Sequence, residues 1–300
     1  MPSPAQDSDL LPPALPLRRV LILGLGLLGG SFGLALRKAE PTATLWGRDS
    51  NPDHQAAALA QGLVQHPWVS AAAPEPFDLV FLAVPTGRIG AALEGLGPWL
   101  SPGTLIVDAC SVKVPVLAAV REALGGHPGF VPSHPIAGSH RSGPEAAEAG
   151  LFQGATVVLT PPPEADPEAV RRAWALWQRL GARIQVVEPQ VHDQVLGLLS
   201  HLPQLLSFAY VDQVADAGVD LGLAGPGFRD FTRLAQSSPE LWADLALANR
   251  GELLPMLQAA REHIAALEER LASGDRTALT AGFQRASELR TAWTGSRSEA

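Results

Sequence analysis

Cysteine and lysine are nearly absent from this 300-residue sequence, whose single cysteine is Cys110 and whose lysines are Lys38 and Lys113. A lone cysteine excludes an internal disulfide and any metal cluster built from cysteines, and no metal site is predicted. Because Cys110 ends an apolar stretch, we expect it to be a small buried residue.

Positive charge is also scarce. The chain has 22 basic against 30 acidic residues, which gives a net charge of −8. It therefore lacks the basic surface by which proteins bind nucleic acid or an anionic membrane, and neither partner is expected. An anionic substrate would have to be bound by a few placed arginines.

Neither a targeting segment nor a membrane span is evident. Residues 1–16 are rich in proline and contain no Lys or Arg, whereas a secretory signal needs a basic start and an apolar core. We expect this stretch to be a disordered tail and the protein to be cytoplasmic. The apolar run over residues 20–36 is shorter than the ~20 residues that span a bilayer, and its glycines would weaken a membrane helix.

The same apolar run has the pattern of a dinucleotide-binding turn. Residues 20–24 are continuously apolar, as in a parallel strand that is buried on both faces. Gly24, Gly26 and Gly29 follow with the spacing G-x-G-x-x-G, ahead of a stretch of helix formers. These glycines permit a tight turn, let a pyrophosphate approach the backbone, and let helix and strand pack closely. The amides that open the helix, at Leu27 and Leu28, would face the phosphates. A glycine-rich turn without a ligand is the alternative.

A second strand is expected at residues 42–47, and Arg48 and Asp49 follow it. An acidic residue at this place accepts hydrogen bonds from the ribose hydroxyls of NAD and repels the additional phosphate of NADP. Arg48 could instead hold that phosphate. We predict NAD as the cofactor, with NADP as the alternative.

Buried strands alternate with helices through the first half of the chain. Further strands are expected at residues 78–84, 104–107, 130–131, 155–159 and 184–187, and helices at 52–61, 89–100, 112–124 and 167–180. This alternation predicts an α/β fold with a Rossmann-type, doubly wound parallel sheet. Ligands bind beyond the carboxyl ends of such strands. The residues expected at the mouth of the site are therefore Val84, Pro85, Thr86 and Ser111.

From residue 191 onward no strand is evident. Amphipathic helices are expected over about residues 191–216, 239–272 and 275–293, with leucines at helical spacing. Such a stripe must be buried, and a second copy of the chain is the economical partner. We therefore divide the chain into a tail (1–16), a dinucleotide-binding domain (17–190) and an all-α substrate and dimerisation domain (191–300), and we expect a homodimer.

Two residues of the first half could take part in catalysis. His134 precedes a glycine-bearing loop, and histidine is suited to accept the hydroxyl proton when a hydride leaves an alcohol carbon. A histidine that bridges the loop backbone is the alternative. Ser111 could hydrogen-bond the imidazole or the nicotinamide amide, or it could cap the helix that follows.

Two polar clusters of the second half could face a substrate. His201 and Gln204 share a helix face, and Pro203 between them would kink the helix toward a cavity. The alternative for His201 is a hydrogen-bonded core histidine. Arg229 and Arg233 could bind a carboxylate in a two-pronged geometry. Salt bridges to neighbouring acidic residues are the alternative for both arginines.

Four segments together resemble the prephenate (or arogenate) dehydrogenases. They are GLGLLGGS from Gly24, HPIAGSHRSG from His134, HDQVLGLLSHLP from His192 and GFRDFTR from Gly227. The resemblance implies a Rossmann domain followed by a helical dimerisation domain. It also implies NAD(P)-dependent oxidative decarboxylation of prephenate to 4-hydroxyphenylpyruvate, or of arogenate to tyrosine, in tyrosine biosynthesis.

The resemblance assigns roles to single residues. His134 corresponds to the catalytic histidine and Ser111 to the serine that orients it, while Arg233 corresponds to the arginine that grips a substrate carboxylate. Ser139 and His201 are expected to line the pocket.

Two positions depart from the family pattern. His140 stands where many members have an acidic residue, and Gln204 stands where they have a second histidine; both are expected to face the substrate. Loss of an acidic partner for an ammonium group favours prephenate over arogenate. A dehydrogenase of another small acid, or a nucleotide-sensing module without catalysis, are the other functions that the residues leave open.

Overall fold

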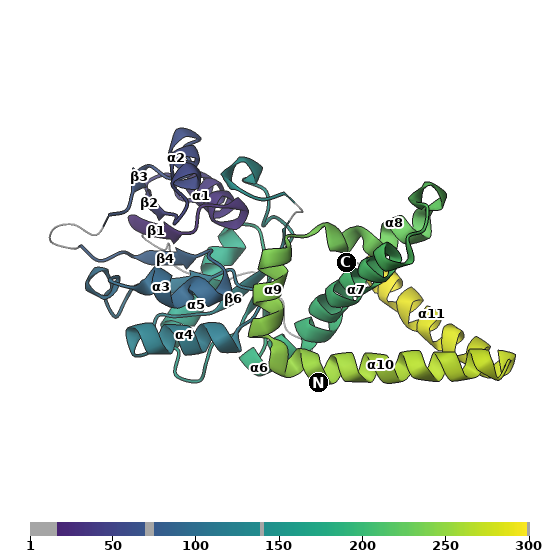
Figure 1. Cartoon of the computed structure of the whole chain (residues 1–300). Coiled ribbons are helices and arrows are strands. Elements are labelled where there is room, and N and C mark those ends of the chain that lie inside the picture. Colours follow the sequence, from purple (N-terminus) through teal and green to yellow (C-terminus); the bar gives the residue numbers. More distant parts are fainter. Residues whose placement is uncertain (1–16, 70–74, 139–140, 299–300) are drawn as a thin grey trace. The chain divides into compact units, whose positions relative to one another are not determined.

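The computed structural model describes residues 17–69, 75–138 and 141–298 (Figure 1). The expected disordered tail, residues 1–16, lies outside the described residues, and so do Ser139 and His140. The chain divides into two compact units, one that runs to Arg250 and one that begins at Gly251.

A five-stranded parallel sheet lies at the centre of the first unit, with the strand order β3-β2-β1-β4-β5. Its strands are β1 (Arg19–Leu23), β2 (Thr44–Arg48), β3 (His66–Pro67), β4 (Leu79–Leu82) and β5 (Leu105–Asp108). Strands β2 and β3 lie on one side of β1, and β4 and β5 lie on the other side. The strand order therefore switches between β1 and β4, which is where doubly wound folds bind their ligands. The Rossmann-type sheet predicted from the sequence is confirmed.

Helices cover both faces of this sheet because successive strand residues point to opposite sides. On one face, Val20 and Ile22 pack with α1 (Leu27–Ala39) and α5 (Pro167–Arg179). The rings of Phe32 and Phe81 stack there with their centroids 4.0 Å apart. On the other face, alternate strand residues pack with α3 (Ile89–Leu93) and α4 (Val114–Leu124).

Of two further helix predictions, the start of one is confirmed and the length of the other is wrong. Helix α2 (Pro52–Ala60) begins as expected, with the Asn51 side chain accepting a hydrogen bond from the Asp53 amide. The helix expected over residues 89–100 is wrong in length, because α3 ends at Leu93. Gly95, at φ +74°, and the following Gly97–Trp99 turn with its proline redirect the chain there.

A second, three-stranded sheet follows, made of β6 (Ser133–Ile136), β7 (Thr156–Leu159) and β8 (Arg183–Val186). Strand β7 pairs antiparallel with β6 and parallel with β8. The strand expected at residues 130–131 is wrong: Phe130 forms only an isolated bridge to Ile106, and the strand begins at Ser133. His134 consequently lies within β6 and not in the loop that follows a strand.

The first unit ends in helices. They are α6 (Pro189–Leu196), a π-helical turn (Gly197–His201), α7 (Leu202–Ala217), α8 (Pro226–Thr232) and α9 (Pro239–Ala248). The π-helical turn occurs just before Pro203, where the ring nitrogen cannot donate to the carbonyl four residues back. The short helix α8 was not expected from the sequence.

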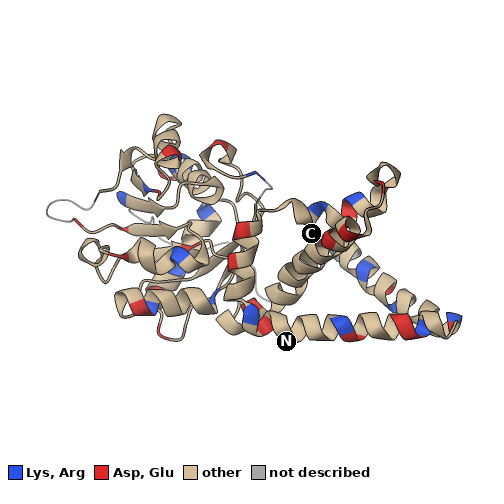
Figure 2. Cartoon of the chain, viewed as in Figure 1, with Lys and Arg blue, Asp and Glu red and all other residues tan. Residues whose placement is uncertain are grey.

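The second unit contains α10 (Arg250–Ala272) from Gly251 onward and α11 (Arg276–Ser298). The single helix expected over residues 239–272 is wrong, because α9 and α10 are separated at the buried Asn249. Lys and Arg are interspersed with Asp and Glu along the helices (Figure 2). Within the described ranges, every helix is too short or too polar to cross a bilayer.

Candidate active site

The glycine turn between β1 and α1 has the geometry that the motif predicts. Gly24 adopts φ +89°, and a Cβ atom there would lie 2.4 Å from the Ala83 carbonyl oxygen. A Cβ on Gly29 would lie 1.8 Å from the Gly24 oxygen, so this glycine lets helix and strand pack closely. A Cβ on Gly26 would meet nothing within 4 Å, which leaves the turn open where a pyrophosphate would approach.

Helix α1 begins at this turn without a side-chain cap. Its first amides, at Leu27 and Leu28, have no acceptor within the helix because the N–H groups of a first turn point away from it. Amides and helix dipole together favour an anion at this end. The turn therefore fits the pyrophosphate of a dinucleotide.

A cleft of about 620 Å³ lies beside the turn, between the ends of β1, β2 and β4. The predicted cofactor residues that line it are Gly24, Gly26, Arg48, Asp49, Val84 and Pro85. The Asp49 carboxylate accepts hydrogen bonds from the amides of Leu25 (2.7 Å) and Asn51 (2.8 Å). The Arg48 guanidinium lies over the Trp68 ring, 5.5 Å from its centroid.

A second cleft of about 450 Å³ adjoins the first and shares part of its lining. The predicted residues that line it are Gly26, Leu27, Leu28, Val84, Pro85, Thr86 and Ser111. Leu241, Asp244 and Leu245 of α9 lie on its other side. The structure thus brings the predicted cofactor residues to two adjoining clefts, except Gly29, which packs helix against strand.

His134 lies on β6, three residues before Ala137, which lines the second cleft. Its side chain is buried, and its Nδ1 is 2.9 Å from Nε2 of His192. Burial lowers the pKa of His134 well below its usual value, and the positive charge of Lys113 lowers it further. His134 is therefore neutral at neutral pH and can accept a proton. Its Nε2 makes no hydrogen bond with any residue that the structure describes.

His192 and Asp193 extend the chain of hydrogen bonds that begins at His134. His192 is fully buried, and its Nδ1 is 2.8 Å from Oδ1 of Asp193. The Asp193 carboxylate accepts hydrogen bonds from the amides of Lys113 (2.7 Å) and Val114 (2.9 Å) at the start of α4. Because α4 has no side-chain cap of its own, Asp193 of α6 caps it from a distant part of the chain.

A buried ion pair holds β6 against β5. The Lys113 ammonium donates to Oδ2 of Asp108 (2.5 Å) and to the Ser133 carbonyl oxygen (2.7 Å), and both charged side chains are fully buried. The Ser133 amide donates to Oδ1 of Asp108 (2.9 Å). These bonds fix the strand that carries His134.

Asp108, Lys113 and Asp193 were missed in the sequence analysis, and His192 entered it only through the resemblance. The sequence did contain a signal for these residues, namely charged side chains within otherwise apolar strands and helices. Asp108 ends a buried strand, and the His192 and Asp193 pair opens an apolar helix. A charged residue in such a place must be paired to be tolerated.

Ser111 lines the second cleft, and α4 begins only at Val114, so the alternative that Ser111 caps this helix is wrong. No hydrogen bond joins Ser111 to His134 among residues 17–69, 75–138 and 141–298. Cys110 is buried as predicted, and burial raises the pKa of its thiol to about 12.

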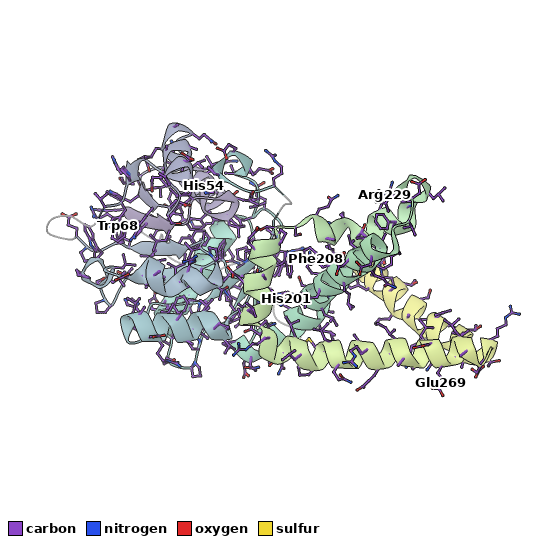
Figure 3. The ribbon with its side chains drawn as sticks, viewed as in Figure 1. His54, Trp68, His201, Phe208, Arg229 and Glu269 are labelled. Atoms are coloured by element: carbon purple, nitrogen blue, oxygen red, sulfur yellow. The ribbon has the colours of Figure 1, made fainter. Side chains whose placement is uncertain are left out.

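His201 is buried at the junction of the π-helical turn and α7 (Figure 3). Its Nδ1 is 3.1 Å from Nδ2 of Asn249, and its ring meets the Trp242 ring edge to face. Burial lowers the pKa of His201 to about 4. It is thus a hydrogen-bonded, neutral histidine at neutral pH.

Gln204 is buried one turn further along α7, and its Nε2 donates to the Leu234 carbonyl oxygen (2.6 Å). It thereby anchors the Arg233–Gln236 turn. Arg233 itself is exposed, and no contact in the described part of the chain joins it to His134. Arg229 lies on α8, at the opposite end of α7 from His201 (Figure 3), and pairs with Asp230 (2.9 Å) on the surface.

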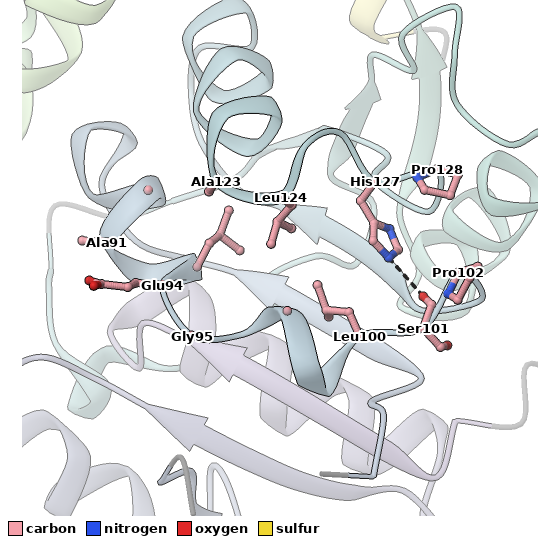
Figure 4. Close-up of a pocket in the computed structure, with 13 residues that line it drawn as sticks. Ala91, Glu94, Gly95, Leu100, Ser101, Pro102, Ala123, Leu124, His127 and Pro128 are labelled. Atoms are coloured by element: carbon pink, nitrogen blue, oxygen red, sulfur yellow. Dashed lines mark hydrogen bonds between the residues drawn. The ribbon is translucent and has the colours of Figure 1, made fainter.

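A third cleft, of about 730 Å³, lies between α3 and α4 (Figure 4). Its lining is mostly apolar, with Glu94, Ser101 and His127 as polar members. Nε2 of His127 is 3.0 Å from the Ser101 carbonyl oxygen. None of the predicted site residues that the structure describes lines this cleft.

Two family models and several known proteins match this chain. A family model described as "Prephenate dehydrogenase, nucleotide-binding domain" matches residues 32–186, and one described as "Prephenate dehydrogenase, dimerization domain" matches residues 188–285. The cyclohexadienyl dehydrogenase of Zymomonas mobilis is 34% identical over 284 residues, which are 92% of this chain and 96% of that protein.

Two solved structures are similar over most of their length. One is the prephenate dehydrogenase from A. aeolicus in complex with hydroxyphenyl propionate and NAD+, with a TM-score of 0.84 and 30% identity, covering 92% of this chain and 98% of that one. The other is the Synechocystis arogenate dehydrogenase, with a TM-score of 0.78 and 30% identity, covering 92% and 99%.

Proposed function

The chain belongs to the prephenate dehydrogenase family, and we propose that it catalyses the NAD-dependent oxidative decarboxylation of prephenate to 4-hydroxyphenylpyruvate in tyrosine biosynthesis. The observation that carries this proposal is His134, a buried neutral imidazole whose Nδ1 is held by His192 and whose Nε2 has no partner among the described residues. Such a group can act as a base.

The residues of the two adjoining clefts fit NAD. The glycine turn and the amides of Leu27 and Leu28 would bind the pyrophosphate, and Asp49 would accept hydrogen bonds from the adenosine ribose. Thr86 and Ser111 would border the nicotinamide in the second cleft. When bound, NAD supplies the acceptor for the hydride. Arg48 and Arg88 also line the first cleft, so NADP remains the alternative cofactor.

His134 moves the proton of the reaction. Its Nε2 accepts the proton of the ring hydroxyl group of prephenate. At the same time a hydride leaves the ring carbon that bears this hydroxyl. The bond to the ring carboxylate then breaks, its electron pair makes the ring aromatic, and CO2 departs. The phenolate oxygen takes the proton back from His134, which restores the base. Because the ring becomes aromatic, the reaction is practically irreversible.

Substrate binding is assigned to Arg233, His201, Gln204, Ser139 and His140. Arg233 supports this assignment by its exposed guanidinium, which makes no ion pair with the residues that the structure describes and suits a carboxylate. The absence of an acidic residue at position 140 favours prephenate over arogenate, whose ammonium group would need one. Relatives named for either substrate are similar to this chain.

We also propose a homodimer, with the domain division at residues 190 and 191. The second family model, described as a dimerization domain, covers residues 188–285. Large apolar side chains are exposed on helices of both units, among them Leu198 (54%), Leu199 (72%), Ile264 (58%) and Phe283 (59%). Sedimentation at micromolar concentration tests the dimer, and a monomer would contradict it. A cytoplasmic location, where NAD and such substrates occur, is part of the proposal.

The direct test is NADH absorbance with NAD and either prephenate or arogenate. We expect turnover with prephenate, and a loss of about 10²- to 10⁴-fold in kcat for His134→Asn with NAD affinity unchanged. Turnover with arogenate alone would identify an arogenate dehydrogenase. No turnover with either substrate, together with tight NAD binding, would favour a nucleotide-sensing module.

A further inference from the structure

We propose that His192 and Asp193 are positioning residues that hold His134 as one tautomer, with a proton on Nδ1 and a bare lone pair on Nε2. The three side chains form a chain in series from the start of α4 to the strand β6. The catalytic consequence rests on the proposed function, whereas the tautomer itself does not.

Asp193 sets the direction of the first hydrogen bond. Its two carboxylate oxygens accept from the amides of Lys113 and Val114, which can only donate. The positive end of α4 compensates the carboxylate charge. Since an ionised carboxylate only accepts, the 2.8 Å contact with His192 requires that Nδ1 of His192 carries a proton.

His192 passes this direction on to His134. A neutral imidazole with a proton on Nδ1 has a lone pair on Nε2, so Nε2 of His192 accepts. The 2.9 Å contact then requires that His134 donates from its own Nδ1. Nε2 of His134 is left as the acceptor, which is the protonation that a base for a substrate hydroxyl needs.

The opposite arrangement requires a protonated His192. Its Nε2 would then donate to Nδ1 of His134, and a neutral His134 would carry its proton on Nε2 and could not act as the base. His192 is fully buried, so charging it carries a desolvation cost, and the Asp193 carboxylate that would compensate the charge already accepts from two backbone amides at the positive end of α4. A buried imidazolium is therefore disfavoured at this position.

Asn249 fixes the tautomer of His201 in the same way. Its Nδ2 donates to the Asp193 carbonyl oxygen (3.0 Å), which fixes the orientation of the amide, and its second proton points to Nδ1 of His201 (3.1 Å). A neutral His201 must then carry its proton on Nε2. Asp193 thus organises both histidines, His134 as an acceptor and His201 as a donor.

Long-range ¹H–¹⁵N correlation spectra of the full-length protein with ¹⁵N-labelled histidine test the tautomer directly at neutral pH, and His134→Asn identifies the signals. We expect a protonated Nδ1 and an unprotonated Nε2 for His134. A proton on Nε2, or a doubly protonated His192, would refute the proposal. This measurement needs no folded His192 variant and no substrate, so a negative turnover result leaves it intact.

Kinetics test the consequence through two variants of one position. His192→Gln keeps an oxygen that can accept near the place of Nε2, whereas His192→Leu keeps no acceptor. We expect His192→Leu to lower kcat by at least about tenfold more than His192→Gln, with the KM for prephenate changed less than about threefold. Equal losses in both variants at equal thermal stability would indicate a merely structural role.

His127 provides the control, because it is a histidine with a hydrogen-bonded ring that lies outside the two adjoining clefts; it is partly buried, whereas His192 is fully buried. His127→Gln and His127→Leu should leave kcat unchanged and should leave the His134 signals in place. A change in the tautomer of His134 in either control variant would contradict the specific role of His192.

Discussion

Replacing Lys113 by methionine should destabilise the protein strongly, because its ammonium is the cation of a fully buried ion pair. The substitution leaves the Asp108 carboxylate buried, with the amides of Cys110 and Ser133 as its remaining partners. Removal of one partner from a buried pair costs about 3–5 kcal/mol in free energy of unfolding. At about 2–4 °C per kcal/mol, the expected fall in Tm is roughly 6–20 °C.

The assay is urea unfolding of four proteins: the unchanged chain, Lys113→Met, Asp108→Asn and the double variant. The asparagine side chain of the double variant would keep an oxygen for one backbone amide and remove the uncompensated charge. The double variant should therefore recover at least about half of the loss of Lys113→Met. Strictly additive losses, or a loss below about 1 kcal/mol for Lys113→Met, would refute the argument that charge pairing holds β6 against β5.

Three further outcomes are expected. Burial lowers the pKa of His201 from 6.5 to about 4, so the unfolded chain binds more protons than the folded chain between these two pH values. The free energy of unfolding should therefore fall by about 3 kcal/mol as the pH falls through this window. His201→Gln should flatten this decline in urea midpoints, and an unchanged slope would contradict the assignment. Gly26→Ala should fold normally but bind NAD weakly in calorimetry, whereas Gly29→Ala should lose thermal stability, because a Cβ there would meet a carbonyl oxygen at 1.8 Å. Arg233→Ala should raise the KM for prephenate by about 10- to 100-fold with NAD affinity unchanged, and an unaltered KM would remove it from the site.

The dinucleotide-binding half was predictable because its signals are local. Continuous apolar residues mark β1, β4 and β5, and the spacing of Gly24, Gly26 and Gly29 marks the turn between β1 and α1. Each signal lies within one element, and the period of buried positions follows directly from strand and helix geometry. The resemblance then assigned the helical half to dimerisation and matched His134 to a catalytic histidine, and both assignments stay predictions.

The errors came where distant residues decide the local structure. The strand was expected at residues 130–131, ahead of His134, but Asp108 holds Ser133 against β5, so β6 begins at Ser133 and includes His134. One long helix was expected where the chain breaks at Asn249, whose side chain bonds to the Asp193 carbonyl oxygen. Apolar periodicity continues across Asn249 and so gives no sign of this break.

By itself the sequence determined the parallel sheet and the dinucleotide turn, because these depend on neighbours along the chain, and it predicted His134 as the residue that takes a proton. Only the tertiary structure decided which nitrogen of His134 is bare. That depends on His192, 58 positions away, and on a carboxylate that caps a helix 80 positions before it. Hydrogen-bond direction is a property of groups brought together in space, and residue spacing along the chain does not contain it.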